Sequence, residues 1–244
     1  IAATWAWLLV LILLPVGGFI LYMFTGRGLS RKKIFQSQSQ IDDGLSALVD
    51  IQRKENRKND LLPKKMLSSE ASEMVNLFLN INNAPVLKNN HVKIYTDGQA
   101  KFDALFADIK QAQKSIHIEY YTIYNDRLGN ELQQLLIQKA KEGVSVNVVY
   151  DAWGSQGATQ KWWRALEDVG GHARTFFSSK HTITDFRLNF RDHRKIVVID
   201  GKIGYIGGFN VGDQYLGRSK KFGHWRDTQL RITGNAVLAL QVRF

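Results

Sequence analysis

Residues 189–200 read NFRDHRKIVVID, and residues 201–210 continue as GKIGYIGGFN. Two apolar runs on either side of a glycine-containing turn predict a β-hairpin or two adjacent strands. Residues i and i+2 of a strand project from the same face, so His193 and Lys195 are expected to project together. Asn210 ends the second run and brings an amide donor to the same place. A nucleophile, a fixed cation and a neutral donor at one point suit an anionic tetrahedral centre, above all a phosphodiester.

The spacing of these residues resembles the H-x-K-x4-D-x6-G-[GS]-x-N signature of the phospholipase D superfamily, with every fixed position filled. The residues at those positions are His193, Lys195, Asp200, Gly207, Gly208 and Asn210. The flanking segments 116–121, 148–155, 208–217 and 225–228 look like the amino-terminal half of bacterial cardiolipin synthases. An alternative is that His193 and Lys195 are ordinary polar residues at a strand start, but chance rarely fills so many fixed positions.

The resemblance implies a membrane phosphatidyltransferase that makes cardiolipin and glycerol from two phosphatidylglycerol molecules through a phosphohistidine. In the resembled family a second signature copy supplies a second His, and which of the two is nucleophile and which is acid stays open. Two alternatives remain. One is a phospholipase D-type phosphodiesterase that hydrolyses phospholipid or nucleic acid, and the other is a non-catalytic membrane protein that binds anionic lipid. The expected partners are phosphatidylglycerol, anionic lipid and a second signature-bearing half, with no nucleic acid.

Two carboxylates belong to the expected catalytic set with different roles. Asp200 lies five residues from Lys195, so in an unbroken strand it points to the opposite face and is expected to support the site by pairing with a backbone group or an arginine. Asp227 is the candidate to hold the His193 ring, because an acidic residue after the signature plays that part in the resembled enzymes and fixes the tautomer. The alternative for Asp227 is a salt bridge with a neighbouring arginine.

Three further residues are candidates for substrate binding. Glu119 shares a strand face with His117 and either reaches the site or forms a buried polar pair with it. Arg187 and Arg191 precede the signature and either bind a lipid phosphate or lie in a solvated loop. The sequence contains no cysteine and no His or Asp cluster with ligand spacing, so neither a metal nor a cofactor is expected.

Strand and helix patterns alternate through the second part of the chain. Strands are expected at residues 92–96, 115–124, 144–150 and 173–177, and helices at 99–113, 130–142, 159–169 and 236–244. This alternation predicts an α/β catalytic domain over residues 86–244, with a phospholipase D-like mixed sheet flanked by helices. Ligands of such sheets bind beyond strand ends, where the signature lies.

The amino terminus predicts a membrane anchor. Residues 1–26 carry no charge and are long enough for a transmembrane helix, although Pro15 lies inside the run. Arg27, Arg31, Lys32 and Lys33 follow, so the positive-inside rule places the rest of the chain in the cytoplasm, at the bacterial plasma membrane. Residues 27–85 are expected to form a basic, polar linker or surface helix, with a short helix at 68–80, and an alternative is a surface that binds anionic headgroups.

The net charge of +11 allows nucleic acid, anionic lipid or an anionic substrate, and does not choose among them. The chain starts with Ile1 and ends at Phe244 inside an expected helix, so both ends look cut. A search for a second signature finds only His91, Lys93 and Asp97, where the Asp comes one residue early and no Gly-Gly-x-Asn follows. Residues 91–97 are therefore expected to be an edge strand, and the second signature is expected outside this chain.

Overall fold

The computed structural model describes residues 2–25, 42–58, 61–62, 68–81, 83–176 and 191–244. The chain divides into two compact units, one formed by Ile1–Gly28 with Asn90–Phe244 and the other by Leu29–Asn89. The boundary at residue 90 lies four residues after the expected start of the catalytic domain, at residue 86.

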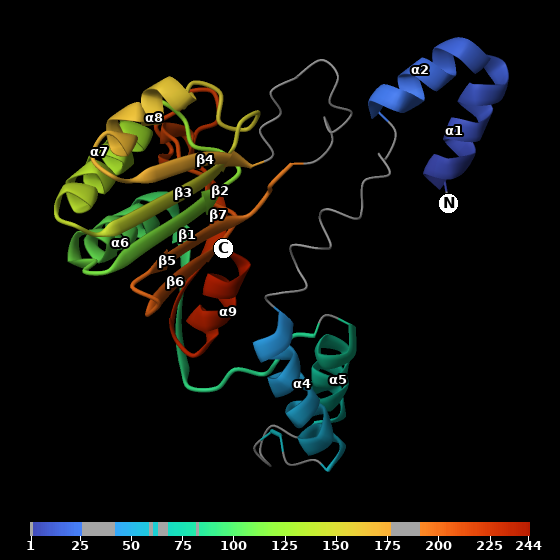
Figure 1. Ribbon diagram of the computed structural model, residues 1–244, viewed down its shortest axis with the longest axis horizontal. Helices are drawn as coiled ribbons and strands as arrows, with labels where there is room; N and C mark the ends of the chain where they lie inside the picture. Colours follow the sequence, from blue (N-terminus) through green and yellow to red (C-terminus); the bar gives the residue numbers. More distant parts are fainter. Residues whose placement is uncertain (1, 26–41, 59–60, 63–67, 82, 177–190) are drawn as a thin grey trace. The chain divides into compact units, whose positions relative to one another are not determined.

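A seven-stranded mixed sheet organises the larger unit, in the order β1-β7-β6-β5-β2-β3-β4 (Figure 1). The strands β2, β3 and β4 run parallel, and the remaining neighbours are antiparallel. The expected α/β fold with a mixed sheet is confirmed. The bounds of the strands are β1 Asn90–Asp97, β2 Ser115–Tyr120, β3 Ser145–Asp151, β4 His172–Phe176, β5 Lys195–Ile199, β6 Ile203–Gly207 and β7 Arg226–Gly234.

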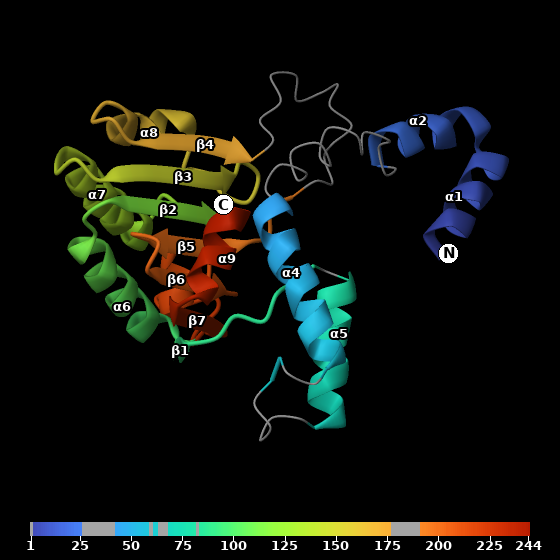
Figure 2. The same ribbon diagram turned by 60° about the horizontal axis from the view of Figure 1, so that its bottom comes forward.

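Helices cover both faces of this sheet (Figures 1 and 2). One face carries α6 (Gly98–Gln111), α7 (Arg127–Lys141) and α8 (Gln160–Glu167), and the other carries α9 (Ala236–Arg243). The first three helices begin where a side-chain oxygen accepts a backbone N–H: Asp97 caps α6, Asp126 caps α7 and Thr159 caps α8. Such caps satisfy donors that a helix start leaves without partners.

The central strand β5 is buried along its whole length, because both of its faces are covered. Val197 and Ile199 join the large core under α6, α7 and α8, whereas Ile196 and Val198 pack in a smaller core that includes Leu240 of α9. Alternating side chains of one strand thus serve two cores. This packing fixes the position of the residues that enter and leave β5.

The hairpin between β5 and β6 follows the sequence prediction, with a turn shifted by one residue. Asp200 and Gly201 both have positive φ, 53° and 65°, and the Lys202 N–H donates to the Ile199 carbonyl at 2.9 Å. Positive φ at both central residues is the conformation of a type I′ turn, for which Asp-Gly is a favoured pair.

Two elements differ from the expected ones for identifiable reasons. The strand expected at 115–124 ends at Tyr120, and the chain beyond it makes only an isolated bridge from Ile123 to Val211. The strand β7 was not predicted, because it buries polar residues on its inner face. Gln229 is fully buried there, and Arg231 forms an ion pair with Asp108 of α6.

The amino-terminal segment forms two helices in place of the expected single helix. The helix α1 (Ala2–Leu13) ends before Leu14, and α2 (Pro15–Thr25) starts at Pro15. A residue before proline is pushed out of the helical region, and proline is favoured in the first turn that follows. The rings of Trp7 and Tyr22 meet edge to face, with centroids 5.2 Å apart. Among the described helices, none combines the length and hydropathy needed to cross a membrane.

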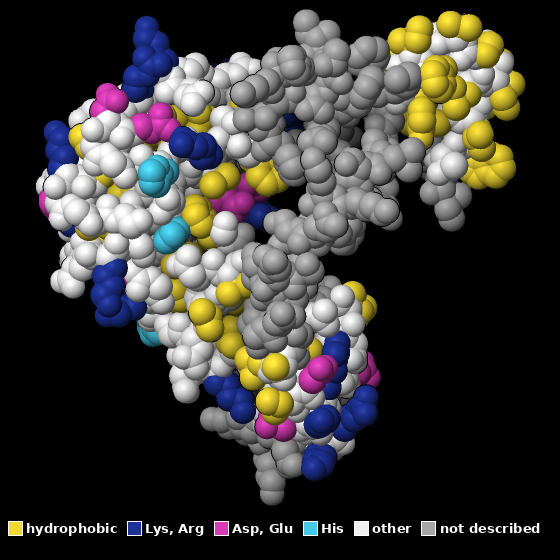
Figure 3. Space-filling view, in the orientation of Figure 1, with side chains coloured by type: hydrophobic (Ala, Val, Ile, Leu, Met, Phe, Trp, Pro, Cys, Tyr) yellow, Lys and Arg dark blue, Asp and Glu magenta, His cyan; other side chains and the backbone are white. Residues whose placement is uncertain are grey.

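The smaller unit holds more structure than the expected linker. The helices α4 (Asp42–Arg57) and α5 (Ser69–Ile81) pack around the buried side chains of Val49, Leu61 and Leu79. The Gln52 side chain exchanges two hydrogen bonds with the Val86 backbone, at 2.9 and 2.7 Å. Lysine and arginine side chains lie on the outside of this unit, whereas the surface over α1 and α2 is apolar (Figure 3). Of the two structures expected within residues 27–85, a surface helix describes α4 better than a structureless linker does.

Candidate active site

The signature residues other than Asp200 gather at one end of the sheet, where β2 and β3 finish and β5 begins. The chain after β2 runs beside the chain after β6, since the Val211 N–H donates to the Thr122 carbonyl at 3.0 Å and the Tyr124 N–H to the Val211 carbonyl at 3.0 Å. Two segments far apart in sequence are thereby joined beside the start of β5. Strand ends of α/β sheets are the usual place for a ligand.

Lys195 is the first residue of β5, and its side chain is almost completely buried. Its ammonium group donates to the His193 carbonyl oxygen at 2.5 Å and lies 5.2 Å from the centre of the Tyr121 ring. Burial lowers the pKa of Lys195, while the charges of Asp192 and Asp227 act in the opposite direction. The His193 carbonyl and the Tyr121 ring therefore hold the Lys195 ammonium group in place.

His193 lies two residues before β5, outside the strand, and its side chain is exposed. Its imidazole ring stacks on the Tyr121 ring, with centroids 4.0 Å apart and planes 17° apart. The expectation that His193 and Lys195 project together as strand neighbours is right in outcome and wrong in cause. They meet because both contact Tyr121, which the sequence analysis did not single out.

Asn210 follows β6 and is buried beside the same site. Its Oδ1 accepts the Thr122 N–H at 3.1 Å, and its Nδ2 donates to the Tyr215 hydroxyl at 2.9 Å. An amide nitrogen carries two hydrogens. The contact to Tyr215 uses one of them and orients the other.

Asp227 lies near this group, close enough for its charge to act on Lys195. Its Oδ1 accepts the Thr228 N–H at 2.7 Å, and no hydrogen bond joins it to His193 among the described contacts. A β-carbon added to Gly208 would lie 1.9 Å from that same oxygen, so this glycine of the signature leaves room for the Asp227 carboxylate. The expected ring-holding role of Asp227 stays a prediction, and its electrostatic effect here is exerted on Lys195.

Asp200 lies beyond the other end of β5 and serves the backbone. Its carboxylate accepts N–H groups of Gln113, Lys114 and Ser115 at 2.9, 2.7 and 3.0 Å, at the start of β2. Burial alone would raise the pKa of Asp200, but these amides and the Lys202 charge outweigh it and lower the pKa. The predicted pairing with backbone matches this geometry, although the reason is the turn and not strand parity. Five strand residues span about 16 Å, which separates Asp200 from the site.

Glu119 forms a buried acidic pair with Asp192, next to His193. Arg194 donates to the Glu119 Oε1 at 3.0 Å, whereas the Glu119 Oε2 and the Asp192 Oδ2 are buried without a hydrogen-bond partner that the structure identifies. Burial and the neighbouring Asp192 carboxylate raise the pKa of Glu119 to about 7. The two groups thus favour holding a proton between them. Glu119 therefore reaches the segment that carries His193 without pairing with His117.

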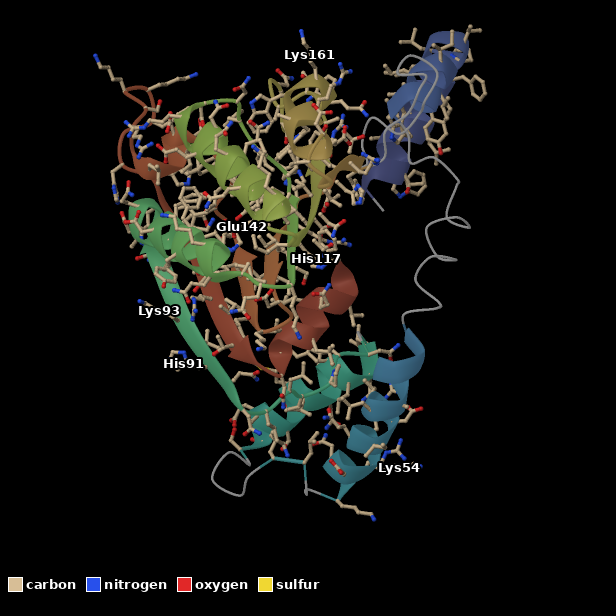
Figure 4. The ribbon with its side chains drawn as sticks, turned by 60° about the vertical axis from the view of Figure 1, so that its left-hand side comes forward. Lys54, His91, Lys93, His117, Glu142 and Lys161 are labelled. Carbon is tan, nitrogen blue, oxygen red and sulfur yellow. The ribbon has the colours of Figure 1, made fainter. Side chains whose placement is uncertain are left out.

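His117 takes a different position from the one that a polar pair with Glu119 requires. Its ring meets the Phe244 ring edge to face, at 4.6 Å, beside α9 (Figure 4). Burial lowers the pKa of His117. His91 and Lys93 lie on β1, at the edge of the sheet and separated from β5 by β7 and β6 (Figure 4). This position agrees with the expectation that they form no site.

Asp151 organises the chain that leads into the signature, and the sequence analysis missed it. Its Oδ1 accepts the N–H groups of Trp153 and Gly154 at 3.0 and 2.9 Å, and its Oδ2 accepts the Asp192 N–H at 3.2 Å. The guanidinium of Arg191 lies 5.0 Å from the centre of the Trp153 ring. Arg187 lies outside the described residues. Asp151 and Tyr121 each stand at or directly after a strand end, which is the one sequence signal that marks them.

The arrangement places an exposed imidazole, a buried ammonium and an oriented amide on or beside the Tyr121–Thr122 segment at the start of β5. Preorganised positive charge and N–H donors stabilise the charge that develops on a phosphoryl group under attack. Within the described part of the chain, no group of three His, Cys, Asp or Glu side chains could hold a metal ion.

Two family models match this chain. One is described as "Cardiolipin synthase, PLD-like domain" and matches residues 105–223, and the other is described as "Phospholipase D-nuclease N-terminal" and matches residues 1–27. The first range contains Glu119, His193, Lys195, Asp200 and Asn210, whereas Asp227 follows it.

Whole-chain similarity extends to named bacterial proteins. The chain is 50% identical over 242 residues to the cardiolipin synthase of Staphylococcus aureus strain Mu50, an alignment that covers 99% of this chain and 49% of that protein. It is 46% identical over 243 residues to the cardiolipin synthase of Listeria innocua, covering 100% of this chain and 50% of that protein. The chain spans about half the length of the curated relatives it matches.

Among solved structures, NucT from Helicobacter pylori is similar with a TM-score of 0.48 and 16% identity, over 64% of this chain and 93% of that one.

Proposed function

Because the chain belongs to the cardiolipin synthase family of the phospholipase D superfamily, we propose that it supplies one half of a phosphatidyltransferase active site. The proposed reaction joins two phosphatidylglycerol molecules into cardiolipin and releases glycerol. The observation that carries the proposal is the meeting of His193 and Lys195 on the Tyr121 ring, beside Asn210.

The proposed first step is attack by a His193 ring nitrogen on the phosphorus of one phosphatidylglycerol. A nitrogen–phosphorus bond forms, and the bond from phosphorus to the headgroup glycerol oxygen breaks. Lys195 and Asn210 bind the non-bridging phosphate oxygens and offset the charge that repels a nucleophile. The leaving glycerol oxygen takes a proton from an acid, which the proposal assigns to a second signature outside this chain.

The proposed second step returns the phosphatidyl group to an alcohol. The headgroup hydroxyl of another phosphatidylglycerol attacks the phosphohistidine, the deprotonated acid of the first step accepts its proton, and His193 is released. Water in place of that alcohol would give phosphatidic acid. Splitting one displacement into two in this way is nucleophilic catalysis.

The proposed location is the bacterial plasma membrane, with the catalytic part in the cytoplasm. Exposed apolar side chains on α1 and α2, among them Ile12, Leu13 and Val16, support contact with lipid. The arginines and lysines at residues 27–33 support the orientation by the positive-inside rule. Labelling of single cysteines placed in the catalytic part, in intact and in opened cells, tests this orientation. Labelling in intact cells by an impermeant reagent would contradict it.

The test of function is a product assay on the full-length protein carrying His193→Ala. Labelled phosphatidylglycerol in mixed micelles is converted, and lipid products are identified by mass. Cardiolipin formation is expected to fall by several orders of magnitude, since loss of a nucleophile removes the covalent path.

The matched control is His172→Ala, an exposed histidine on β4. This variant should make cardiolipin at the rate of the unchanged protein. Cardiolipin formation that persists in His193→Ala would contradict the proposal. Phosphatidic acid as the main product of the unchanged protein would favour the hydrolytic alternative.

A further inference from the structure

Two large aromatic side chains are exposed on segments linked to the active site, and each lies near a cation. Trp153 is 57% exposed, and the Arg191 guanidinium lies 5.0 Å from its ring centre. Phe222 is 47% exposed, and the Lys221 ammonium lies 5.3 Å from its ring centre. Removing an exposed aromatic ring from water is favourable, so a partner that covers these rings would gain free energy of binding.

Trp153 is connected to the site through Asp151. The Trp153 N–H donates to one Asp151 oxygen at 3.0 Å, and the other Asp151 oxygen accepts the Asp192 N–H at 3.2 Å. Asp192 directly precedes His193. The backbone of Trp153 is thus fixed to the segment that carries His193.

Phe222 is connected to the site from the other side through two aromatic rings. Its ring lies 5.8 Å from that of Trp225, which lies 5.0 Å from that of Tyr215, both in edge-to-face contacts. The Tyr215 hydroxyl accepts a hydrogen bond from Asn210 at 2.9 Å. The two exposed aromatics therefore lie on segments attached to opposite partners in the site, His193 and Asn210.

Positive charge is concentrated beside Phe222. Residues 218–226 contain four lysines and arginines and no acidic residue. Arg218 forms an ion pair with Asp213 at 2.9 Å, whereas no described acid forms an ion pair with Lys220, Lys221 or Arg226, whose side chains are exposed. Most of the positive charge of this segment is therefore exposed and can bind an external anionic partner.

We propose that these side chains form an aromatic–basic rim that seats the active-site opening on the surface of an anionic lipid bilayer. The rim consists of Trp153, Arg191, Lys220, Lys221, Phe222 and Arg226. This inference rests on the proposed function, because a phospholipid substrate presents its phosphate at headgroup depth. Tryptophan prefers that depth, and lysine and arginine bind the negative surface of such a membrane.

Exposed aromatics with basic neighbours also suit single-stranded nucleic acid, whose bases stack on aromatic rings. The exposed apolar side chains of α1 and α2 favour a bilayer over nucleic acid as the partner. A protein that these helices hold at a membrane keeps its other surfaces close to lipid. Nucleic acid and a covering protein segment are therefore outcomes that the experiment must distinguish.

The absence of cysteine from residues 1–244 makes the test direct. The full-length protein, with any cysteine beyond this chain replaced by serine, receives one cysteine at Ala152 or Lys220, next to the two aromatics. Matched control sites are Ser145, at the other end of β3 from Ala152, and Lys202, in the turn at the far end of β5. All four positions are exposed. Each cysteine carries a fluorophore, and the protein is placed in nanodiscs of phosphatidylglycerol or phosphatidylcholine.

The readout is quenching by a spin label attached near the headgroup of the lipid, compared with quenching by a water-soluble quencher. Strong lipid quenching at Ala152→Cys and Lys220→Cys in phosphatidylglycerol, weaker in phosphatidylcholine or high salt, and little at the two control sites is the expected result. Equal lipid quenching at all four sites would overturn the rim. Protection from the aqueous quencher without lipid quenching would overturn it too, in favour of a protein cover.

A charge reversal tests whether the two sides act together. Lys221→Glu should lower the lipid quenching measured at Ala152→Cys, whereas Lys202→Glu should leave it unchanged. If neither change affects quenching, charge does not seat the rim and the proposal fails. Fluorescence changes at Ala152 and Lys220 on addition of an oligonucleotide without lipid would identify nucleic acid as the partner and also overturn it. None of these readouts depends on turnover, so they stand or fall separately from the His193→Ala assay.

Discussion

The two ends of β5 place carboxylates in opposite surroundings. At the far end, Asp200 receives the N–H groups of three consecutive residues, and its pKa is lowered. At the near end, Glu119 and Asp192 are buried with one oxygen each lacking a partner, and the pKa of Glu119 is raised to about 7. A carboxylate supplied with donors stabilises a fold, whereas carboxylates short of donors are retained where a site needs them.

This difference supports the proposal that the near end of β5 carries the chemistry and that the far end stabilises the fold. Lys195 and His193 lie at the end of β5 that contains the buried acidic pair. Lys202 lies in the turn with Asp200, at the other end. Variants that change one end of β5 and leave the other intact therefore test this division of roles.

After His193→Ala, the largest effect on the rate is expected for Lys195→Ala. Lys195→Ala removes the cation from the phosphate site and should slow cardiolipin formation by about 10²–10³-fold, the usual cost of one preorganised donor at a developing charge. Lys202→Ala, at the other end of the strand, should keep the rate of the unchanged protein. Initial rates in mixed micelles measure both. Similar losses of rate in the two variants would contradict the proposal that only the near end of β5 carries the chemistry.

A smaller effect is expected from Asp200→Ala. Loss of the hydrogen bonds to residues 113–115 should reduce the free energy of unfolding by about 1–3 kcal/mol, because backbone donors lose a charged acceptor. The lowered pKa of Asp200 means that its stabilisation is present at neutral pH and is lost as the pH falls through the folded-state value.

The difference between Asp200→Ala and the unchanged protein should therefore shrink in acid, as thermal melting at several pH values would show. The variant should still form cardiolipin below its melting temperature. A complete loss of activity in folded Asp200→Ala would place this residue in the chemistry.

These expectations also mark what the sequence could predict. The hairpin and the alternation of strands and helices follow from local patterns, and the structure confirms them, with the turn of the hairpin one residue earlier than expected. The contacts that build the site are not local: Thr122 and Asn210 are 88 residues apart, and Asp200 and Gln113 are 87 apart. Tyr121 and Asp151 were missed because nothing in a single strand shows which distant loop will lie against its end.

The polar strand β7 was missed for a related reason. Its inner face pairs Arg231 with Asp108 and buries Gln229, so its pattern lacks the apolar alternation on which prediction depends. The end of α1 before Leu14 could have been predicted from Pro15, because proline disfavours the helical conformation of the residue before it. The sequence analysis instead expected one continuous helix.

A still smaller effect concerns pH at the near end. Between a pH of 4.5 and about 7, the folded protein keeps a proton on Glu119 that the unfolded chain has released. Stability from this site therefore falls as the pH rises through that range and changes no further above it. Glu119→Gln stays neutral and should flatten this part of the curve of melting temperature against pH. An unchanged slope in the variant would show that the acidic pair does not hold the proton.

The most direct test of the whole account is to trap the covalent intermediate. The full-length protein is mixed briefly with labelled phosphatidylglycerol, quenched in alkali to preserve phosphohistidine, digested and sequenced by mass spectrometry. We predict a phosphatidyl adduct, or the glycerophosphoryl adduct that alkali leaves after cleaving its acyl esters, on His193, absent from His193→Ala and present in His172→Ala. An adduct on a different histidine during normal turnover, with His193 unmodified, would contradict it.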